Sequence, residues 1–299
     1  MWGRHHVDVP VGVVDVGSNT VRLLVSENGR TVLSERAMLR LGADIERHGE
    51  IPEQKLEQTA SVVGGLVAKA HAAGVGAIEI LIASPGRQAA NGTELAERLQ
   101  RAAGCRTRIL SSAEEGQLAF IGALSCARVS GWRTVAVVDV GGGSAQVVVG
   151  SRKSGPVWSR SIDLGSQRLT SRLLSDDPPG SAGIAQARDE VEHYLHGFDP
   201  PLPRTTLAVG GSARALKRMV GGRIGTAELD DALSQLAMTP TAVIARQYGI
   251  GEERARTLPA GAVIFSALQR RLDTPLKVQR GGLREGALLT LAAEQSIAA

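Results

Sequence analysis

The sequence predicts an α/β protein built from two similar units, each of which opens with a β-meander and continues with alternating helices and strands. The pentapeptide VVDVG occurs at residues 13–17 and again at 137–141, and each copy is a run of β-branched residues that ends in an acid and leads into Gly or Ser. The first copy begins a predicted order of three strands, a helix, a strand and a helix. The same order begins again at the second copy. A third apolar run, at 206–209, also leads into a glycine pair. Together these observations indicate a duplicated unit.

The first unit contains a hairpin directly after its first strand. Asn28 and Gly29 form the strongest short hairpin signal available, between apolar runs that alternate. Pro52 and Gly74 bracket an amphipathic helix. We expect strands at 20–26, 30–37, 77–83 and 105–110, and helices at about 53–72, 93–103 and 113–129, with Pro85 and Gly86 in a loop.

The second unit repeats this order. We expect strands at 134–140, 144–151, 155–163 and 206–209, mostly helical structure from 226 onward, and a closing helix within 281–298.

Composition restricts the kind of protein and partner. At 299 residues with 43% hydrophobic side chains, the chain is long enough for two cores. A net charge of only +4 and 3% aromatic residues argue against a nucleic-acid partner. No apolar run reaches membrane-spanning length and the first ten residues lack a signal-like segment, so we expect no membrane partner and a cytoplasmic location. Cys105 and Cys126 are expected as reduced thiols.

The duplicated loops have the chemistry of a phosphate site. An acid at a strand end, such as Asp15 or Asp139, can hold a metal or position water, and the small residues that follow let backbone N–H groups approach an anion. A single loop of this kind is as readily a tight turn whose Asp caps its own backbone, but the duplication argues against that interpretation. Gln146 stands where a dinucleotide-binding fold needs its third glycine, and no GxxxxGK[ST] motif occurs, so Rossmann and P-loop folds are disfavoured.

Seven motifs in order then carry a family resemblance. They are DVGSNTVRL (15–23), LRLGADIERHGEIPEQKLEQT (39–59), ASPGRQAAN (83–91), SSAEEG (111–116), DVGGGSAQ (139–146), VGGSA (209–213) and GLREG (282–286). In this set the chain resembles the exopolyphosphatase and guanosine pentaphosphate phosphohydrolase (Ppx/GppA) family, in its short form, within the actin and sugar-kinase superfamily.

The resemblance implies a fold and a reaction. It implies two ribonuclease-H-like domains with mixed five-stranded sheets flanked by helices and an active-site cleft between them. The first domain would span 1–128 and the second 129–281, with the helix at 282–299 packing back on the first. It also implies Mg²⁺, a homodimer, and hydrolysis of the terminal phosphoanhydride of inorganic polyphosphate, with pppGpp as a second possible substrate, so that guanosine penta- or tetraphosphate is a possible ligand.

The resemblance also implies roles for residues. Glu115 would be the general base, with Asp15 and Asp139 as catalytic acids that flank the phosphates and the metal. The residues expected to bind phosphate are Gly17, Ser18, Asn19, Arg22, Arg87, Gly141, Gly142, Gly143, Ser144, Gly210, Gly211 and Ser212. The metal ligands would be Asp15, Asp139 and Gln146.

Some of these residues have simpler interpretations. Ser112 and Glu115 also fit a capping box, in which Glu115 only bonds the backbone at the start of its helix, and Glu114 is expected as a first-turn helix charge. Arg22 is as readily a structural ion-pair partner as a phosphate contact. By default, Arg168, Arg214, Lys217 and Arg284 are solvated surface charges. The alternative is that these four residues line a route for a longer polyanion.

The chain also departs from the family pattern. Gln146 replaces an acid, Arg256 replaces an acid before a helix, and Pro85-Gly86 replaces the usual residues ahead of Arg87. A neutral amide lowers the expected affinity for a hard cation. Two hypotheses therefore stand: an exopolyphosphatase, and a weakly active or inactive sensor that binds polyphosphate or (p)ppGpp. A kinase of the same superfamily is a third and less favoured possibility, because no adenosine-binding signature is found.

Overall fold

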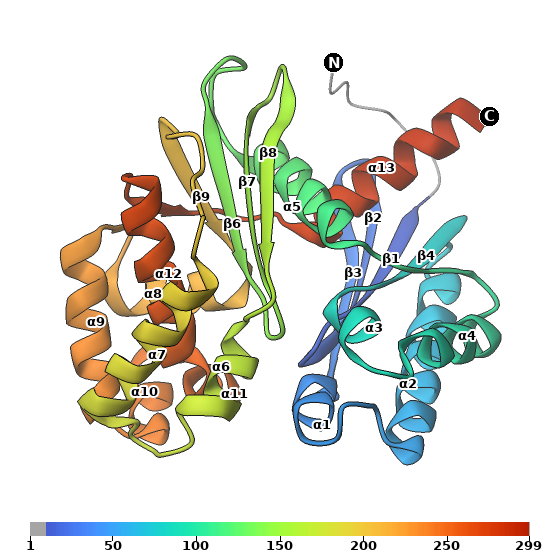
Figure 1. The fold of residues 1–299 in the computed structure, drawn as a ribbon. Coiled ribbons are helices and arrows are strands. Elements are labelled where there is room, and N and C mark those ends of the chain that lie inside the picture. Colours follow the sequence, from blue (N-terminus) through green and yellow to red (C-terminus); the bar gives the residue numbers. More distant parts are fainter. Residues whose placement is uncertain (1–9, 299) are drawn as a thin grey trace. The chain divides into compact units, whose positions relative to one another are not determined.

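The computed structural model describes residues 10–298. These residues form two compact units (Figure 1). Unit 1 consists of the chain up to Gly122 together with the C-terminal segment from Leu283, and unit 2 of Ala123–Gly282. Each unit contains one β-sheet with helices packed against it.

Unit 1 has a five-stranded mixed sheet in the order β3-β2-β1-β4-β5. β1 pairs antiparallel with β2 and parallel with β4, which pairs parallel with β5. The predicted hairpin is confirmed, because Asn28 and Gly29 both adopt the left-handed backbone of a tight turn between β2 and β3. The strands are β1 (Val11–Val16), β2 (Thr20–Glu27), β3 (Arg30–Met38), β4 (Ala77–Ile82) and β5 (Arg106–Ile109).

Alternating side chains of this sheet enter two separate cores. Val14 and Val16 belong to the core that includes α2, whereas Val11 and Val13 pack with residues of α13. This is the two-residue period of a strand buried on both faces. The helices of unit 1 are α1 (Leu41–His48), α2 (Glu53–Ala72), α3 (Ser84–Gln88), α4 (Gly92–Ala103) and α13 (Leu283–Ala298). The helix α5 (Ser112–Cys126) begins in unit 1, and its last four residues belong to unit 2.

One local prediction in unit 1 is wrong. Residues 84–88 form the short helix α3 where a loop was expected. Pro85 is compatible with this helix because it lies in the first turn, where the backbone N–H that proline lacks has no intrahelical partner.

Unit 2 repeats the same sheet order with one more strand. Its order is β10-β11-β9-β6-β7-β8, with β6, β9 and β11 parallel and β10 antiparallel at one edge. The expectation of five strands is therefore corrected to six, because residues 223–224 pair with the end of the short strand β11. The strands are β6 (Val135–Val140), β7 (Ala145–Ser151), β8 (Gly155–Ile162), β9 (Thr205–Val209), β10 (Arg223–Ile224) and β11 (Leu276–Val278).

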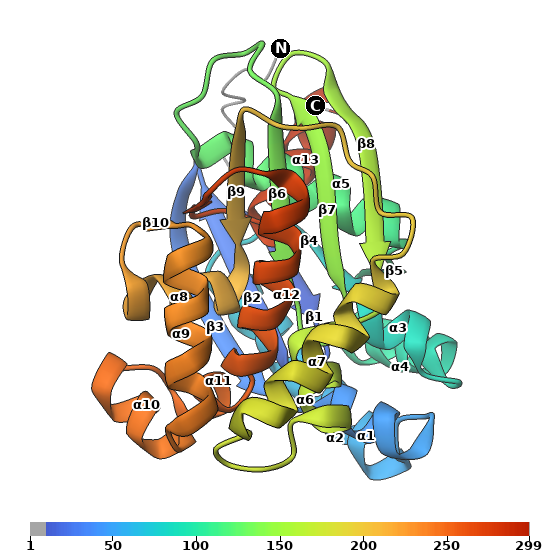
Figure 2. The same ribbon diagram turned by 60° about the vertical axis from the view of Figure 1, so that its left-hand side comes forward.

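The core of unit 2 is organised around α12 (Leu258–Leu272), which Figure 2 shows in front of β6 and β9. This helix is buried along almost its whole length, as expected of a helix that is apolar on every side. The other helices of the unit are α6 (Ser166–Leu173), α7 (Gly180–Tyr194), α8 (Gly210–Val220), α9 (Thr226–Met238), α10 (Thr241–Tyr248) and α11 (Glu252–Arg256).

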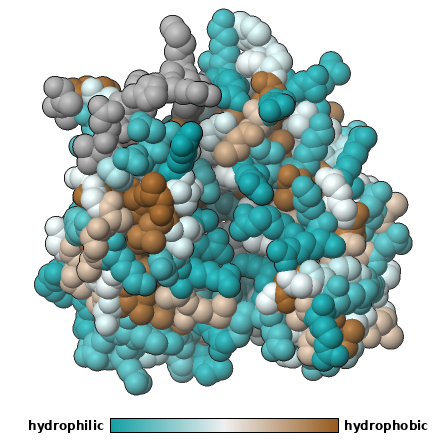
Figure 3. Space-filling model, turned by 180° about the vertical axis from the view of Figure 1, so that it is seen from behind, coloured by the Kyte–Doolittle hydropathy of each residue, from teal (hydrophilic) through white to brown (hydrophobic). Residues whose placement is uncertain are grey.

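The surface in Figure 3 is mostly hydrophilic, with hydrophobic residues in small patches. Among the helices of residues 10–298, none combines the length and the apolar character needed to cross a membrane.

Candidate active site

One group of candidate residues lies where the parallel strands of unit 1 end. The Ser18 hydroxyl, in the loop after β1, is 2.6 Å from the Ser84 hydroxyl, which begins α3 after β4. The Leu110 amide, at the end of β5, donates to the Ile82 carbonyl at the end of β4. The carboxyl ends of β1, β4 and β5 therefore lie side by side, which is where open α/β sheets bind ligands.

Arg87 and Glu115 form an ion pair at this edge. Nη2 of Arg87 donates to Oε2 of Glu115 at 2.7 Å, and Nη1 donates to the Leu110 carbonyl at 2.7 Å. The Glu115 side chain is 13% exposed and that of Arg87 21%. The guanidinium is thus fixed on a backbone carbonyl and holds the candidate base by a charge-assisted hydrogen bond.

The capping box of α5 involves a different glutamate from the one expected. The Ser111 amide and hydroxyl both donate to Oε2 of Glu114, at 2.8 and 2.7 Å, and the Glu114 amide donates back to the Ser111 hydroxyl at 3.2 Å. These hydrogen bonds hold the pKa of the Glu114 carboxyl below its usual value, chiefly through the Ser111 hydroxyl. The box is therefore Ser111 with Glu114, and Glu115 points to Arg87.

Asp15 lies at the end of β1 in a partly desolvated position. Burial raises the pKa of its carboxyl, while the positive charges of Arg284 and Arg22 act in the opposite direction. Arg22 is its register partner on β2. Arg284, which the sequence suggested as part of a polyanion route, is brought beside Asp15 by α13.

Asn19 has its backbone carbonyl engaged and its side chain unsatisfied. The carbonyl accepts from the amides of Leu39 and Arg40. Its side-chain Oδ1 is buried without a hydrogen-bond partner. A buried amide oxygen of this kind is an acceptor that a ligand, a water or a cation can satisfy.

A second group of candidate residues lies at the corresponding edge of the unit 2 sheet. Oδ1 of Asp139, near the end of β6, is so close to Gly210 that a Cβ there would stand 2.6 Å from it, and Gly210 has a positive φ of 89°. Glycine is therefore required at 210 both for the backbone and for the carboxylate beside it. Gln146 is the register partner of Asp139, and its amide donates to the Ser144 hydroxyl at 2.9 Å.

The two duplicated loops share one internal hydrogen bond. The Gly17 amide donates to the Thr20 carbonyl at 3.2 Å, and the Gly141 amide donates to the Ser144 carbonyl at 3.0 Å. Both amides, which we expected to bind phosphate, are thus used within their loops. Amides at the start of α6 donate to the Gly141 and Gly142 carbonyls and hold the second loop in place.

The third loop is the N-terminus of a helix. Gly210, Gly211 and Ser212 are the first residues of α8, and no side chain caps it. The first amides of a helix have no intrahelical partner and carry partial positive charge, so they are suited to an anion.

Arg254 is a residue of this edge that the sequence analysis missed. Its Nη1 donates to the Ser212 hydroxyl at 3.0 Å, and a Cβ at Gly211 would stand 2.6 Å from its Nη2. The available signal was the pair of arginines at 254 and 256, of which only the second was considered. Arg256 instead donates to the carbonyls of Leu174 and Ser175.

Arg168, another predicted route residue, forms an ion pair at 2.7 Å with Asp163. Arg214 and Lys217 lie on α8.

The side-chain oxygens near the two acids fit a cation that is also coordinated by the phosphate oxygens of a substrate. Within residues 10–298 no three His, Cys, Asp or Glu side chains cluster as a metal cage. Mg²⁺ commonly binds one or two carboxylates and otherwise keeps water and substrate phosphate oxygens. Asp139 with the Gln146 amide oxygen, and Asp15 with Asn19, meet that requirement.

Comparison with known proteins identifies the family. The sequence profile described as the Ppx/GppA phosphatase family matches residues 24–295. "Exopolyphosphatase 1" of Mycobacterium leprae is 29% identical over 93% of this chain and 88% of that protein. The protein of the same name from Mycobacterium tuberculosis is 30% identical over 93% of this chain and 87% of that protein.

Solved structures share the fold. A Ppx/GppA family member from Aquifex aeolicus superposes with a TM-score of 0.81 at 23% identity, covering 96% of this chain and 98% of its own. An exopolyphosphatase from Cytophaga hutchinsonii gives a TM-score of 0.85 at 19% identity, covering 95% and 98%. The expected fold is confirmed, and since the profile spans most of the sequence, the chain belongs to the Ppx/GppA phosphatase family.

Proposed function

We propose that this protein is an exopolyphosphatase, which removes the terminal phosphate of inorganic polyphosphate by hydrolysis, with pppGpp as a second substrate. The observation that carries the proposal is the Arg87–Glu115 pair at the carboxyl ends of the unit 1 strands. It supplies a carboxylate base and a phosphate-binding guanidinium in direct contact. The relatives named exopolyphosphatase support the choice of substrate.

In this proposal Glu115 accepts a proton from the attacking water. The water oxygen forms a bond to the terminal phosphorus, and the bridging P–O bond breaks with its electron pair remaining on the shortened chain. Arg87 binds an oxygen of the transferred group, because a guanidinium matches the geometry of phosphate oxygens. The ion pair with Arg87 also orients the carboxylate.

The loops of unit 2 provide a second set of phosphate-binding groups. The first amides of α8 and the Arg254 guanidinium provide positive charge beside Asp139. Asp139 and Gln146 of unit 2 would be Mg²⁺ ligands, and Asp15 is the corresponding carboxylate of unit 1. When bound, the metal neutralises phosphate charge as the terminal phosphoryl group is transferred.

The test is the Glu115→Gln substitution, which removes the base and keeps the shape of the side chain. We expect phosphate release from polyphosphate to fall by about 10²- to 10⁴-fold, with binding of polyphosphate retained. Glu97→Gln, an exposed residue of α4, is the matched control and should leave the rate unchanged. A Glu115→Gln enzyme as fast as the wild type would overturn the role of Glu115.

A second candidate function rests on Gln146. This side chain is neutral where the family pattern has an acid, and its amide is committed to Ser144. A sensor that binds polyphosphate or (p)ppGpp without hydrolysis is therefore the alternative. Phosphate release is measured with polyphosphate, pppGpp and ATP in the presence of Mg²⁺. If the wild type binds polyphosphate but releases phosphate no faster than Glu115→Gln, the protein is a sensor. If the wild type releases phosphate from ATP but not from polyphosphate or pppGpp, the site is a nucleotide site of the kinase type.

A homodimer and a cytoplasmic location are the remaining proposals from the family resemblance, and sedimentation of the purified chain tests the first.

A further inference from the structure

A second group of cations lies at the opposite end of the unit 2 sheet from Asp139. Arg133 and Thr134 directly precede β6, and Arg204 directly precedes β9, which pairs parallel with β6. These residues are therefore at the amino ends of the strands whose carboxyl ends carry Asp139 and Gly210. With six residues at about 3.3 Å each in β6, the two ends are about 20 Å apart.

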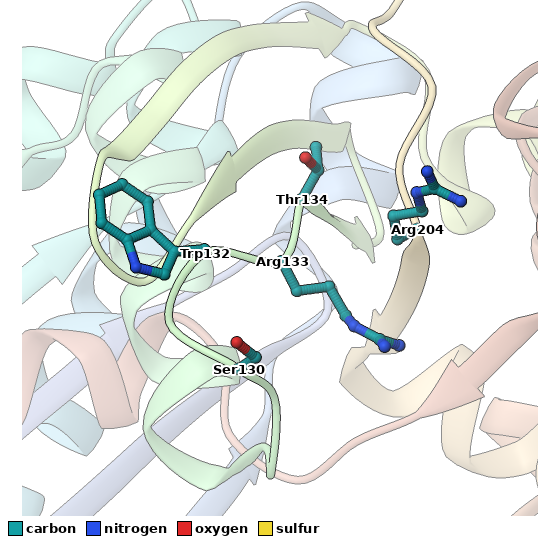
Figure 4. A pocket seen from close by; sticks show the side chains of 5 residues that line it. All are labelled: Ser130, Trp132, Arg133, Thr134 and Arg204. Carbon is teal, nitrogen blue, oxygen red and sulfur yellow. The ribbon is translucent and has the colours of Figure 1, made fainter.

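A shallow surface pocket of about 450 Å³, largely open to solvent, lies at this end (Figure 4). It is lined by Ser130, Trp132, Arg133, Thr134 and Arg204. Backbone hydrogen bonds join the three segments around it: the Arg204 amide donates to the Thr134 carbonyl at 2.9 Å, and the Lys153 amide donates to the Gly131 carbonyl at 3.0 Å. The cavity is thus built from a fixed backbone, and its lining is two guanidinium groups, two hydroxyls and an indole.

Positive charge predominates around the pocket, although the exposed Asp199 stands just before residue 200 and the exposed Asp273 lies shortly before β11, which pairs with β9. The segments 127–134, 151–155 and 200–204 contain Arg128, Arg133, Arg152, Lys153 and Arg204, and no Asp or Glu. Arg152 donates to carbonyls at the end of α5, so it has a structural role. Arg133 and Arg204 are exposed. Such a surface attracts an anion that carries several charges.

The arrangement of the side chains favours an extended ligand. Figure 4 shows the guanidinium groups of Arg133 and Arg204 on one side of the 130–134 loop and the Trp132 ring on the other. Trp132 is 71% exposed, and Nζ of Lys153 lies 3.8 Å from its ring centre. Cations are therefore present on both sides of this loop, an arrangement that suits a ligand with several phosphates.

We propose that this cavity, which we call the amino-end pocket, is a second binding site for the inorganic polyphosphate chain. This rests on the proposed function for the identity of the chain. Arg133 and Arg204 bind phosphate oxygens, with Ser130 and Thr134 as hydroxyl donors and Lys153 as a further cation. Because the pocket is remote from Asp139 in the same unit, it increases the affinity for long chains more than for short ones.

The test measures binding in the full-length Glu115→Gln background, which prevents loss of the ligand by hydrolysis. The probes are long-chain polyphosphate and inorganic triphosphate, and the variant is Arg133→Ala with Arg204→Ala. We expect the Kd for the long chain to rise about tenfold, since charge-assisted hydrogen bonds are lost, and the Kd for triphosphate to rise much less. The salt dependence of long-chain binding should also become shallower, because fewer counterions are exchanged.

Arg128→Ala is the matched control, since Arg128 is exposed on the same loop and does not line the cavity. If the double variant and Arg128→Ala have the same Kd for long-chain polyphosphate, the proposal that this pocket binds polyphosphate is wrong. If the wild type binds polyphosphate without hydrolysing it, the proposed function fails and this comparison still decides the pocket. A Kd for guanosine triphosphate that rises in the double variant while the long-chain Kd does not would assign the pocket to nucleotides instead.

Discussion

At the scale of single residues, the candidate loops of each unit contain polar side chains that are nearly out of contact with water. Ser18, Ser144 and Gln146 are each 3% exposed and Ser212 is fully buried. Buried polar groups are retained where they are hydrogen-bonded or where a ligand completes them. The buried Oδ1 of Asn19 has no hydrogen-bond partner among residues 10–298, so it is available to a ligand, as the proposed function requires.

Gln146→Glu tests whether the missing acid limits metal binding. A second carboxylate beside Asp139 should lower the Mg²⁺ concentration for half-maximal phosphate release by about tenfold, because hard cations prefer charged oxygen ligands. Without Mg²⁺ the variant should unfold at a lower temperature, since it holds an unpaired buried charge. Gln186→Glu, on the exposed face of α7, is the control. An unchanged Mg²⁺ dependence would remove Gln146 from the metal site.

Asp15→Asn tests the cost of a desolvated carboxylate. The raised pKa of Asp15 means that the folded state favours the neutral carboxyl, so its contribution to stability is complete below the ordinary value of 3.8 and is lost as the pH rises through the raised value. The Asn variant should therefore be more stable than the wild type at about pH 7.5, with a smaller difference at about pH 4.5, while phosphate release falls. Urea unfolding at both values measures this, with the exposed Asp231→Asn as control. A variant less stable than the wild type at the higher pH contradicts the prediction.

At the scale of elements, the start of α5 decides where the candidate base lies. Residues 111–115 read Ser-Ser-Ala-Glu-Glu, so the capping-box spacing fits both Ser111 with Glu114 and Ser112 with Glu115. The structure selects the first pair. Arg108 reinforces it, because its guanidinium joins Glu114 at 2.9 Å to the buried Glu79 at 2.6 Å.

Ser111→Ala and Ser112→Ala separate these two registers. Loss of a capping serine costs about 1 kcal/mol of unfolding free energy, so Ser111→Ala should destabilise by that amount. Ser112→Ala should stay within about 0.5 kcal/mol of the wild type. Denaturant unfolding distinguishes them, and the reverse order would mean that the box is the one the sequence first suggested. Ser111→Ala should also lower kcat more than it raises KM, since Glu115 follows the cap directly.

At the scale of the whole molecule, the C-terminal helix completes the N-terminal unit. Leu283, Leu288 and Leu291 of α13 pack against Val13 and Leu24 in one core. Gly286 makes this approach possible, because a Cβ there would overlap the Leu118 carbonyl of α5. The last sixteen residues before 299 thus cover a face of the first sheet and bring Arg284 to Asp15.

Gly286→Ala should therefore destabilise the protein, whereas the same substitution at Gly65 should not. Gly65, within α2, has open space where its Cβ would lie. Alanine there should add about 0.5–1 kcal/mol of helix stability. At 286 the overlap should cost about 1–3 kcal/mol, as for other overpacked sites. Thermal unfolding of the two variants gives the comparison, and equal changes would mean that α13 does not pack closely on α5.

Much of this arrangement could be predicted from local patterns. The strand periods, the Asn28–Gly29 turn, the α2 boundaries and the duplicated acids follow from side-chain alternation and turn chemistry, which act over a few residues. The motifs also located Arg87 and Glu115. The sequence could not predict their contact, because they are brought together by the pairing of β4 with β5 and the start of α5.

The sequence by itself determined the duplicated strand-and-loop pattern, the positions of the acids and the family. Only the tertiary structure decided that β10 and β11 extend the second sheet, that Arg254 lies over Gly211, and that Arg133 and Arg204 line one pocket. The physical reason is the separation along the chain between the residues in contact. Turns, caps and periods depend on neighbours within one or two turns of chain, whereas these contacts join residues from different segments, which only packing of the whole chain brings together.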